Sequence, residues 1–486
     1  MEIEMALKIG NRNQYSFLPP VIDKYVGEDD PVRVYDAFVE TLDFEKIGID
    51  INNNKVGNSS YDPKAMMKLL VYGYSYGIRS SRKLERATKH NLSFIWLMGD
   101  LKPDHKTIAN YRKNNKKALK EVLVQSAQLC MELNLIDGNI LFLDGSKIRG
   151  NSSINKTRTK EGLEKQLKQI EEMVEELLKE SEKIDKLEEG QTVKLTEELS
   201  TTQSRKKKIE EAIKKIKETE NRNINITDNE SVMIKGRQGT HSGYNAQMVV
   251  DEKNGLIVSS NVVSKSNDLG QFSSEIKNAN EVLGKKCKTA CADAGYFDLK
   301  DLNELAKEEI EIIVPNTKQA AHNPKEITIY DKENFKYDKE KDIYICPEGK
   351  ELRFKRTKEK SKCHEYIIKN KSDCLNCKNY GNCTESNSGR TITRSVYEDL
   401  KEKLSKVYDS EEGKKVYKLR KSKVELPFGH IKRNLNGGYF LLKGQDGANA
   451  EMSINCSCFN IVRMIKLLGG VCQFINELRK IKLKYA

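Results

Sequence analysis

The spacing of hydrophobic and polar positions changes several times along this chain of 486 residues. Up to residue 138 the apolar positions recur every three or four residues, which predicts amphipathic helices. One such run, Met66–Leu70, follows Asp62-Pro63, where the aspartate can accept hydrogen bonds from free helical N–H groups and the proline suits a first turn. We therefore expect residues 1–138 to form an all-helical domain.

Basic residues are concentrated on two later helical segments of this domain. One segment begins after Ser80, and the other begins near Pro103 and runs through Tyr111-Arg112-Lys113. A helix, a short turn and a basic helix are typical of a DNA-binding module. A plain helical bundle with a solvated basic face fits the same pattern, so the sequence leaves both interpretations open.

Short apolar runs, some of which end in an acidic residue, then replace the helical spacing and predict β-strands. Helical segments separate the later strands, and tight turns cannot pair strands that are joined in this way, so part of the sheet is expected to be parallel. An α/β core with a mixed sheet is thus predicted to start at residues 139–155 and to continue over residues 222–315. The predicted strands are residues 139–145, 244–251, 256–263, 288–293 and 310–314.

Residues 156–221 interrupt this core with a heptad repeat. Apolar residues follow alternating steps of four and three from Leu163 to Ile184, Gly190 breaks the pattern, and a second arm with its own apolar positions follows. The first arm is rich in Glu and the end of the second is rich in Lys. We expect an antiparallel helical hairpin with charge pairing between its arms, which serves as a spacer or a dimer contact.

Two further regions complete the predicted organisation. Residues 316–394 are polar, rich in Lys and hold five of the 11 cysteines. Residues 395–486 contain helical patterns over 396–432 and 450–482, which we assign to the core as its C-terminal helices. The fold expected from the pattern is an α/β core with an all-α N-terminal domain, a helical-hairpin insertion and a small Cys-rich insertion.

Composition narrows the class of protein. No run approaches the ~20 apolar residues that a membrane span needs, and the N-terminus lacks the basic and apolar pattern of a signal peptide. We expect a cytoplasmic protein without a membrane partner, whose reduced cysteines are metal ligands or buried thiols rather than disulfides. The net charge of +13 is compatible with a nucleic-acid partner, although charge alone does not identify one.

Two acidic residues share a context that suits phosphoryl transfer. Asp144 and Asp293 each end an apolar strand, and ligands bind at the carboxyl ends of strands in an α/β sheet. Paired carboxylates with open coordination positions suit Mg²⁺ or Mn²⁺, and two such ions can activate water or a 3′-hydroxyl against a phosphodiester. Two aspartates that only cap strand ends would look the same in the sequence.

A third acidic residue lies in a basic stretch that begins as a helix. Tyr417 and Arg420 precede Glu425, and Lys432 follows it. Glu425 could complete a metal site, Arg420 and Lys432 could hold DNA phosphates, and Tyr417 could stack near the DNA backbone. An amphipathic basic helix with one neutralising glutamate is the alternative interpretation.

These segments together resemble a known family. LFLDGSKIRGN, GYNAQMVVD, ADAGYFD and the Tyr417–Lys432 stretch are similar to bacterial insertion-sequence transposases with a DDE catalytic triad. More narrowly, they resemble insertion-sequence family eleven-eighty-two, within the superfamily that carries a Y-R-E-K signature. The N-terminal run GYSYGIRSSRKLE to TIANYRK, the Cys-rich insertion and the C-terminal tail resemble that family as well, so the resemblance covers nearly the whole chain.

The resemblance implies a ribonuclease-H-like catalytic core in which Asp144, Asp293 and Glu425 bind Mg²⁺ or Mn²⁺. One departure concerns the spacing: the superfamily usually has three residues between Arg and Glu, whereas this chain has four, and Lys421 stands at the usual distance from Glu425. The residues that would match the Y-R-E-K signature are Tyr417, Arg420, Glu425 and Lys432.

The implied activity is metal-dependent transposition of DNA. Water attacks at the terminal inverted repeats of the element and frees a 3′-hydroxyl, which then attacks target DNA without a covalent protein–DNA intermediate. Two ends must be brought together, so the resemblance implies a homodimer in a synaptic complex, associated with the nucleoid.

Several other polar residues near these motifs have competing interpretations. Asn245 and Gln247 alternate on one face of a predicted strand and could hydrogen-bond DNA or a carboxylate, although surface polar residues fit equally well. Asn267-Asp268 is most simply a helix cap, and His430 is most simply structural.

The Cys-rich insertion carries a candidate zinc site. It contains a CxxC pair with one cysteine before it and one after it. The segment is too polar to fold readily without a stabilising cross-link such as a bound metal ion. We expect a structural Zn²⁺ ion rather than free thiols, with Cys363-His364 as substitute ligands, and we place the cysteines outside the insertion, Cys472 among them, in the core. The four candidate ligands are Cys346, Cys374, Cys377 and Cys383.

Two other functions share part of this pattern. A metal-dependent nuclease would use the same carboxylates, and only the joining of 3′ ends to target DNA separates it from a transposase. A retired, non-catalytic DNA-binding protein need not keep three spaced carboxylates. A coiled-coil scaffold would explain residues 156–221 but would leave the strand-end acids without a role.

Overall fold

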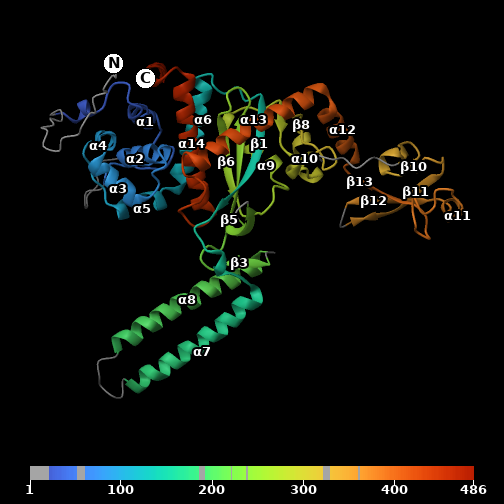
Figure 1. Cartoon of the computed structure of the whole chain (residues 1–486), viewed down its shortest axis with the longest axis horizontal. Coiled ribbons are helices and arrows are strands. Elements are labelled where there is room, and N and C mark those ends of the chain that lie inside the picture. The colour runs from blue at the N-terminus through green and yellow to red at the C-terminus, as the bar shows by residue number, and fades with distance from the viewer. Residues whose placement is uncertain are drawn as a thin grey trace, which may run out of the picture.

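A computed structural model describes residues 21–51, 61–184, 192–219, 222–236, 239–320, 329–359 and 362–485 of the chain. These residues form a mixed α/β molecule in which helices surround one central sheet (Figure 1). A long helical hairpin and a separate small sheet extend from this body. The mixed α/β class predicted from the sequence is thus confirmed.

The central sheet combines antiparallel and parallel pairing. Its strands are β1 (Ile140–Arg149), β4 (Val232–Gly236), β5 (Gly239–Asp251), β6 (Ile257–Val263), β7 (Thr289–Cys291) and β8 (Glu311–Ile313). β5 pairs antiparallel with β1, β4 and β6, whereas β1, β7 and β8 are parallel neighbours. The crossovers that parallel pairing needs contain α9 (Phe272–Leu283) and α10 (Leu299–Ala306).

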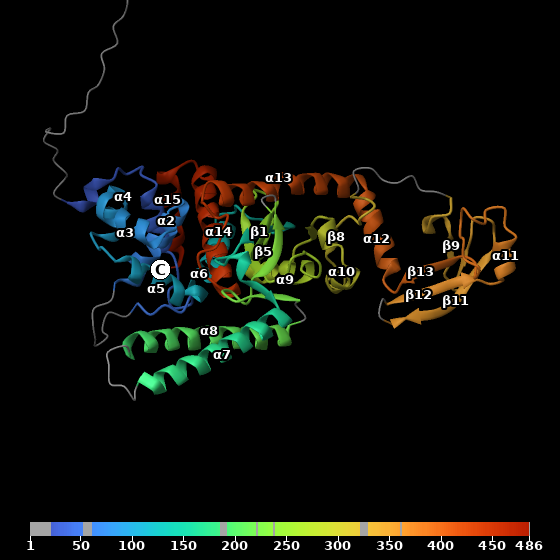
Figure 2. The same ribbon diagram turned by 60° about the horizontal axis from the view of Figure 1, so that its bottom comes forward.

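The N-terminal helices form one cluster beside the sheet (Figure 2). Asp62 accepts hydrogen bonds from the N–H groups of Lys64 and Ala65, so the predicted cap does begin a helix at Pro63. After a 3₁₀ turn at Ile22–Tyr25, the helices are α1 (Val32–Val39), α2 (Pro63–Ser75), α3 (Ser81–His90), α4 (Leu92–Met98), α5 (His105–Asn114) and α6 (Lys116–Glu132).

The C-terminal region contains two breaks that divide the predicted helical stretches. The helices are α12 (Glu398–Asp409), α13 (Glu411–Arg433), α14 (Gln445–Leu467) and α15 (Val471–Tyr485). Ser410 ends α12 and caps α13, because its hydroxyl accepts a hydrogen bond from the Gly413 N–H at 3.0 Å. Gly469 and Gly470 separate α14 from α15 with φ angles of +86° and +117°, a region that favours glycine.

Helix α14 connects the N-terminal helices to the sheet, since it packs on α2 and α6 as well as on β6. No single helix among the described residues is long and apolar enough to cross a membrane. Residues Gln445–Leu467 and Val471–Ile481 reach that length and composition only when taken together, and they are bent by 104°.

A buried group of charged residues joins these helices. Glu451 of α14 is fully buried and accepts hydrogen bonds from Tyr74 Oη at 2.9 Å and from Arg79 Nη2 at 3.3 Å. Arg112 Nη1 lies 3.9 Å from the same carboxylate. Arg79 also donates to the carbonyl oxygens of Asn436 and Tyr439, in the loop that follows α13. One glutamate thus fixes two arginines of the N-terminal helices to the C-terminal part of the chain.

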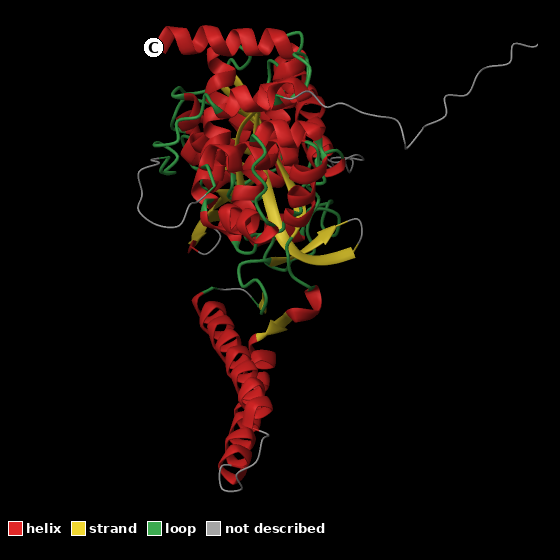
Figure 3. Ribbon diagram, turned by 90° about the vertical axis from the view of Figure 1, so that its left-hand side faces the viewer, coloured by secondary structure: helices red, strands yellow, loops and turns green. Residues whose placement is uncertain are grey.

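The insertion at residues 156–221 is a pair of long helices that points away from the body (Figure 3). Its helices are α7 (Lys160–Ile184) and α8 (Thr192–Glu218), and at its base β2 (Thr157–Thr159) pairs with β3 (Asn223–Asn225), after a 3₁₀ turn at Ile154–Lys156. Heptad residues from both arms, among them Leu163, Ile170 and Ile213, form a hydrophobic cluster of their own. Lys206 on α8 forms an ion pair with Glu171 on α7 at 3.1 Å. Gly190, the predicted break, lies outside the described residues.

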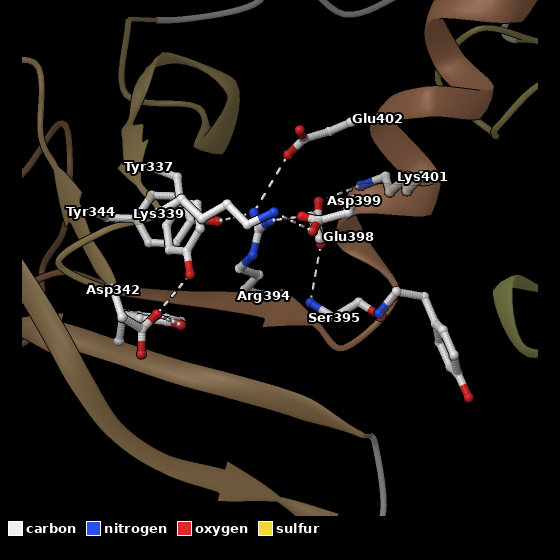
Figure 4. A network of polar contacts seen from close by, with 12 residues as sticks. Tyr337, Lys339, Asp342, Tyr344, Arg394, Ser395, Glu398, Asp399, Lys401 and Glu402 are labelled. Atoms are coloured by element: carbon white, nitrogen blue, oxygen red, sulfur yellow. Dashed lines mark hydrogen bonds and ion pairs between the residues drawn. The ribbon is translucent and has the colours of Figure 1, made fainter.

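The Cys-rich region contains an antiparallel sheet with a short helix beside it. The elements are β9 (Lys336–Asp338), β10 (Ile343–Ile345), β11 (Glu351–Lys358), β12 (Cys363–Ile368), α11 (Lys371–Leu375) and β13 (Thr391–Ser395). A polar network at Arg394 attaches this sheet to α12 (Figure 4). The guanidinium lies 3.9 Å from the ring centroid of Tyr337, and it contacts Asp399 and, at 3.4 Å, Glu402.

Candidate active site

The register of the central sheet brings Asp144 and Asp293 to the same level. Phe142 of β1 pairs with Cys291 of β7, and each aspartate lies two residues further along its chain. Because side chains alternate along an extended chain, the two carboxylates point the same way. The two acids therefore become neighbours in the folded chain. Asp144 does not end its strand as predicted, because β1 continues to Arg149 in pairing with β5, whereas Asp293 does follow the end of β7.

Burial and charge both act on Asp144, whose side chain is 20% exposed. Burial raises the pKa of this carboxyl to about 6; the Arg420 guanidinium opposes the shift, whereas Asp293 and Asp268 add to it. A half-buried carboxylate beside other carboxylates is stabilised by a cation in its charged form. The site therefore favours a bound positive charge.

Helix α13 already supplies one such charge. Arg420 Nη1 lies 3.5 Å from Asp144 Oδ1, and the Arg420 side chain is only 13% exposed. The guanidinium carbon lies 5.5 Å from the ring centroid of Tyr417, one turn earlier on the helix. Lys421, by contrast, is exposed. Arg420 and Lys421 are the two candidates for the arginine position of the Y-R-E-K signature. Arg420 is the one that faces Asp144.

Glu425 does not join this pair in the structure. Its side chain is exposed on α13. Glu425 stands five positions after Arg420, a rotation of about 140° around an α-helix, so the face that carries Arg420 to Asp144 turns Glu425 away. Across the described ranges, no three His, Cys, Asp or Glu side chains lie close enough together to hold one metal ion.

Asp268 is a third carboxylate beside the two aspartates, and the sequence interpretation missed it. Its Oδ1 accepts hydrogen bonds from Asn245 Nδ2 at 2.7 Å and from Gln247 Nε2 at 2.9 Å, and Lys147 Nζ lies 3.4 Å away. Asp268 is therefore not the helix cap that we expected. That role belongs to Asp301, whose Oδ2 accepts from the first N–H of α9, at Phe272.

The same contacts favour one of the interpretations that the sequence left open for Asn245 and Gln247, namely hydrogen bonds to a carboxylate. Both residues are fully buried, so neither presents its amide to DNA, and both instead hold the Asp268 carboxylate. Tyr296 completes this group by donating its hydroxyl hydrogen to Gln247 Oε1. The alternation of two amides along β5 was the available sequence signal, and the partner they share could be found only in the folded chain.

Gly145 allows this close packing. A Cβ atom at that position would lie 2.5 Å from Asp268 Oδ1 and 2.9 Å from Tyr296 Oη, which is closer than real Cβ contacts. The glycine that follows Asp144 in the sequence is therefore required because Asp268 approaches the backbone of β1.

Lys432 and His430, which follow Glu425 on α13, lie in different surroundings. Lys432 Nζ donates to Ser146 Oγ at 2.6 Å and to the Lys147 carbonyl oxygen at 3.3 Å, so it reaches β1 two residues beyond Asp144. The ring of His430 packs on Phe459, and burial lowers the pKa of the histidine. This placement agrees with a structural histidine.

The predicted zinc ligands lie far along the chain from this site, in the small sheet. The four cysteines line one cavity, and residues of α11 form part of its wall. Most of the other cysteines are buried, but Cys472 is exposed on α15, which corrects its assignment to the core. The four cavity cysteines are Cys346, Cys374, Cys377 and Cys383.

Two family models match the chain. Residues 20–114 match a family described as Transposase domain (DUF772), and residues 345–465 match one described as Transposase DDE domain. The second segment contains Arg420 and Glu425, whereas Asp144 and Asp293 precede it.

The matches support a transposase of the DDE type. A DDE domain implies a ribonuclease-H-like fold. No curated protein and no solved structure matches the chain. The expectation of a transposase is thereby confirmed at the level of the domain types.

Proposed function

We propose that this chain is the DNA transposase of a bacterial insertion sequence, a member of family eleven-eighty-two within the Y-R-E-K superfamily. It binds the terminal inverted repeats, cleaves DNA at the element ends and joins the 3′ ends to target DNA. One observation carries the proposal: Asp144 on β1 and Asp293, two residues after the parallel neighbour β7, lie at the same level of the sheet, and Asp144 faces Arg420, which belongs to the segment that matches a transposase DDE domain.

The donor set fits a hard divalent cation. Asp144 and Asp293 offer carboxylate oxygens, and a bound cation would oppose the burial and the neighbouring carboxylates that raise the pKa of Asp144. These two residues would hold Mg²⁺ or Mn²⁺, which supplies activation of the attacking oxygen and neutralisation of charge on the phosphodiester.

The chain's own cations orient the DNA at this site. Arg420 lies against Asp144, where its guanidinium can pair with a phosphate next to the cleaved bond. Lys432 reaches β1 at Ser146, two residues further along the strand, where its ammonium can contact the next phosphate. The ring of Tyr417 lies against the guanidinium group of Arg420.

Two residues are candidates for the third carboxylate of the catalytic triad. Asp268 stands beside the pair, fixed by Asn245 and Gln247. Glu425 is the residue that the family signature assigns, and it reaches the site only if α13 rotates or partly unwinds when DNA binds. We propose that Glu425 completes the triad in the DNA complex, and that Asp268 positions the neighbouring side chains of β1 and β5.

The remaining parts of the proposal follow from the organisation of the chain. The N-terminal helices, which match the first transposase domain, bind the inverted repeats. Two copies synapse the two ends of the element, in the cytoplasm and on the nucleoid.

Cleavage of labelled element-end DNA in Mg²⁺ tests the proposal. Asp144→Asn and Asp293→Asn remove a charge and keep the shape, so each variant should lose at least ~100-fold in cleavage rate while binding the same DNA. Asp137→Asn is the matched control, because Asp137 precedes β1 and its exposed side chain pairs with Lys253 at the surface. Glu425→Gln and Asp268→Asn, assayed in parallel, decide which residue is the third carboxylate.

The products distinguish the alternatives. Joined 3′ ends in the wild-type reaction identify a transposase, and cleavage without joining identifies a nuclease. Binding without cleavage by the wild type would identify a retired DNA-binding protein. Equal cleavage by the wild type and by both aspartate variants would show that the active site lies elsewhere.

A further inference from the structure

Four cysteines from separate parts of the Cys-rich region line one cavity of about 410 Å³. Cys346 follows β10, Cys374 and Cys377 lie in and just after α11, and Cys383 lies in the loop before β13. All four are free thiols. Burial raises the pKa of Cys383, Arg390 opposes that shift, and the other three thiols lie close enough to add to it.

Backbone groups are already directed at two of the sulfur atoms. The Lys350 N–H donates to Cys346 Sγ at 3.3 Å, and the Arg390 N–H donates to Cys374 Sγ at 3.4 Å. These donors lie in the wall of the cavity and help to fix the positions of two of the four sulfur atoms.

The segment that carries three of these cysteines has no hydrophobic core. Across residues 371–390, the only buried residue is Gly389. The apolar cluster of the small sheet is formed by side chains of other segments, such as Leu352 and Tyr366. A segment of this length without buried side chains needs another stabilising link to keep one conformation.

We propose that Cys346, Cys374, Cys377 and Cys383 bind one structural Zn²⁺ ion. Four thiolates in a tetrahedral arrangement are a preferred ligand set of zinc, and a closed site of this kind is structural rather than catalytic. The four sulfur atoms surround the cavity without converging on one point, so the cysteine side chains rotate inward when the ion binds. The ion fixes residues 371–390 to the edge of the small sheet.

Metal analysis of the full-length protein, purified without chelator, tests this site. The wild type should contain about one zinc per chain, and Cys374→Ser/Cys377→Ser should contain none. Cys472→Ser is the matched control, because this exposed cysteine lies outside the cavity and should leave the zinc content unchanged. Replacement of zinc by Co²⁺ should give the absorption bands of tetrahedral thiolate coordination in the wild type and not in the double variant.

A second readout covers the case in which the double variant misfolds. Chelation of the wild type should open the backbone around Lys371 and Lys378 to trypsin, and added Zn²⁺ should restore protection. A wild-type chain that contains no zinc, takes up none after reduction and is cut equally with and without chelator would overturn the proposal.

An independent observation concerns the surface between the hairpin and the core. Two neighbouring cavities, of about 730 Å³ and 530 Å³, share Lys156 and Lys443 in their walls. Glu211 is the only acidic residue that lines either one. We call this surface the basic groove and define it by its six basic residues, Arg149, Lys156, Arg158, Arg205, Lys208 and Lys443.

The charges of the basic groove are not compensated. Within the part of the chain that the structure describes, no ion pair joins any of the six to an acidic side chain. Arg158 donates only to backbone carbonyl oxygens, and the other five side chains are exposed. Lys206 and Lys215 lie on α8 as well, but they pair with Glu171 and Glu230 respectively. A concave surface with unpaired charges of one sign attracts a polyanion.

The position of the basic groove relates it to the candidate active site. Arg149 lies five residues beyond Asp144 on β1, a distance of about 16 Å at ~3.3 Å per residue, and because side chains alternate along a strand the two side chains leave opposite faces of β1. Tyr439, 42% exposed, lies beside Arg149 in the same wall and offers an aromatic face to a sugar or base.

We infer that the basic groove binds the DNA backbone of the element end outside the cleaved phosphodiester. This inference rests on the proposed function and extends it by assigning a DNA path between the base of α7–α8 and the loop after α13. The hairpin then acts as one wall of the DNA-binding surface in addition to any role as a spacer.

Salt-dependent binding of the full-length protein to labelled element-end duplex tests the basic groove. Arg205→Glu/Lys208→Glu should weaken binding at least ~10-fold and lower the slope of log K against log salt by about 2, since two phosphate contacts are lost. Lys207→Glu/Lys214→Glu is the matched control, because these exposed lysines of the same helix do not line either cavity. The control should leave the slope unchanged.

The outcomes separate this inference from the proposed function. If the wild type does not bind the duplex, the proposed function fails together with the basic groove. If the wild type and the groove variant bind with the same affinity and the same slope, the groove assignment alone is overturned. Equal losses in the groove and control variants would also overturn it, because the effect would then reflect net charge.

Discussion

At the scale of single residues, two buried carboxylates of the core are held differently. Asp144 faces a guanidinium and two other carboxylates, at a position where a divalent cation would be stabilised. Glu275 on α9 is 2% exposed and accepts one hydrogen bond, from Asn261 Nδ2 at 2.7 Å. Burial raises the pKa of Glu275 to about 7, and the Asn261 bond only partly opposes that shift. Asp144 thus faces a cation of the chain itself, whereas Glu275 lowers stability when it is charged.

Stability should therefore depend on pH through Glu275. The unfolded carboxyl ionises near its ordinary pKa of ~4.3, whereas the folded one ionises near 7. Its contribution is fully present below about pH 4 and is lost as the pH rises through 7, by on the order of 3 kcal/mol. Glu275→Gln keeps the acceptor for Asn261, so it should raise the Tm by several degrees at pH 8 and change it little at pH 5.

Thermal melts at the two pH values check this expectation. Glu281→Gln, an exposed position on the same helix, is the control and should have no pH-dependent effect. A Glu275→Gln variant that is less stable than the wild type at pH 8 would contradict the argument.

At the scale of elements, α13 shows how helix geometry selects which residues meet. Val424, Phe428 and Ile431 are buried, and Arg420 lies on the same side of the helix, against Asp144. This face is fixed by the apolar side chains, which recur at the spacing of helical turns. Glu425 lies on a different side of the helix, and its side chain is exposed. The position of Glu425 thus follows from the packing of α13 and not from its own chemistry.

The insertions show a second property of the elements. The hairpin and the small sheet each have a hydrophobic cluster separate from the main core. Elements with their own clusters can open locally without unfolding the rest. A site that depends on them, such as the basic groove, can therefore move relative to Asp144 when DNA binds.

At the scale of the whole molecule, one buried glutamate holds the N-terminal helices on the body. Glu451 lies between Arg79 and Arg112, whose side chains are 1% and 8% exposed. The same carboxylate accepts from the N–H groups of Leu441 and Leu442. The domain that matches one transposase model is thus rigidly connected, through α14, to the domain that matches the other.

Glu451→Gln should destabilise the full chain by about 3–5 kcal/mol, because it leaves two buried arginines without their counter-charge. Urea denaturation measures the loss. Glu477→Gln removes a charge from a surface pair with Lys480 and should cost less than about 1 kcal/mol. An equal, small effect of both substitutions would show that the buried group does not hold the helices in place.

The sequence by itself determined most of the local elements, because apolar spacing and caps act within a few residues. It ended the first strand too early, since β1 continues past Asp144 to Arg149. The helical N-terminal region, the heptad arms, the mixed sheet and the CxxC pair are all local patterns of this kind. Register then placed Asp144 beside Asp293, as expected for parallel strands. The DDE type was predictable too, because it depends on motifs in a fixed order.

Only the tertiary structure decided which distant side chains meet. In the sequence, Asp268 could equally be a helix cap. Its contacts with Asn245 and Gln247 on β5 exist only in the folded chain. Glu425 matches the family signature, yet the packed face of α13 directs it outward. The basic groove is assembled from β1, the hairpin and a loop near residue 443, which lies more than 200 residues beyond the other two. Such contacts depend on the packing of whole elements, and no local pattern of residues encodes that packing.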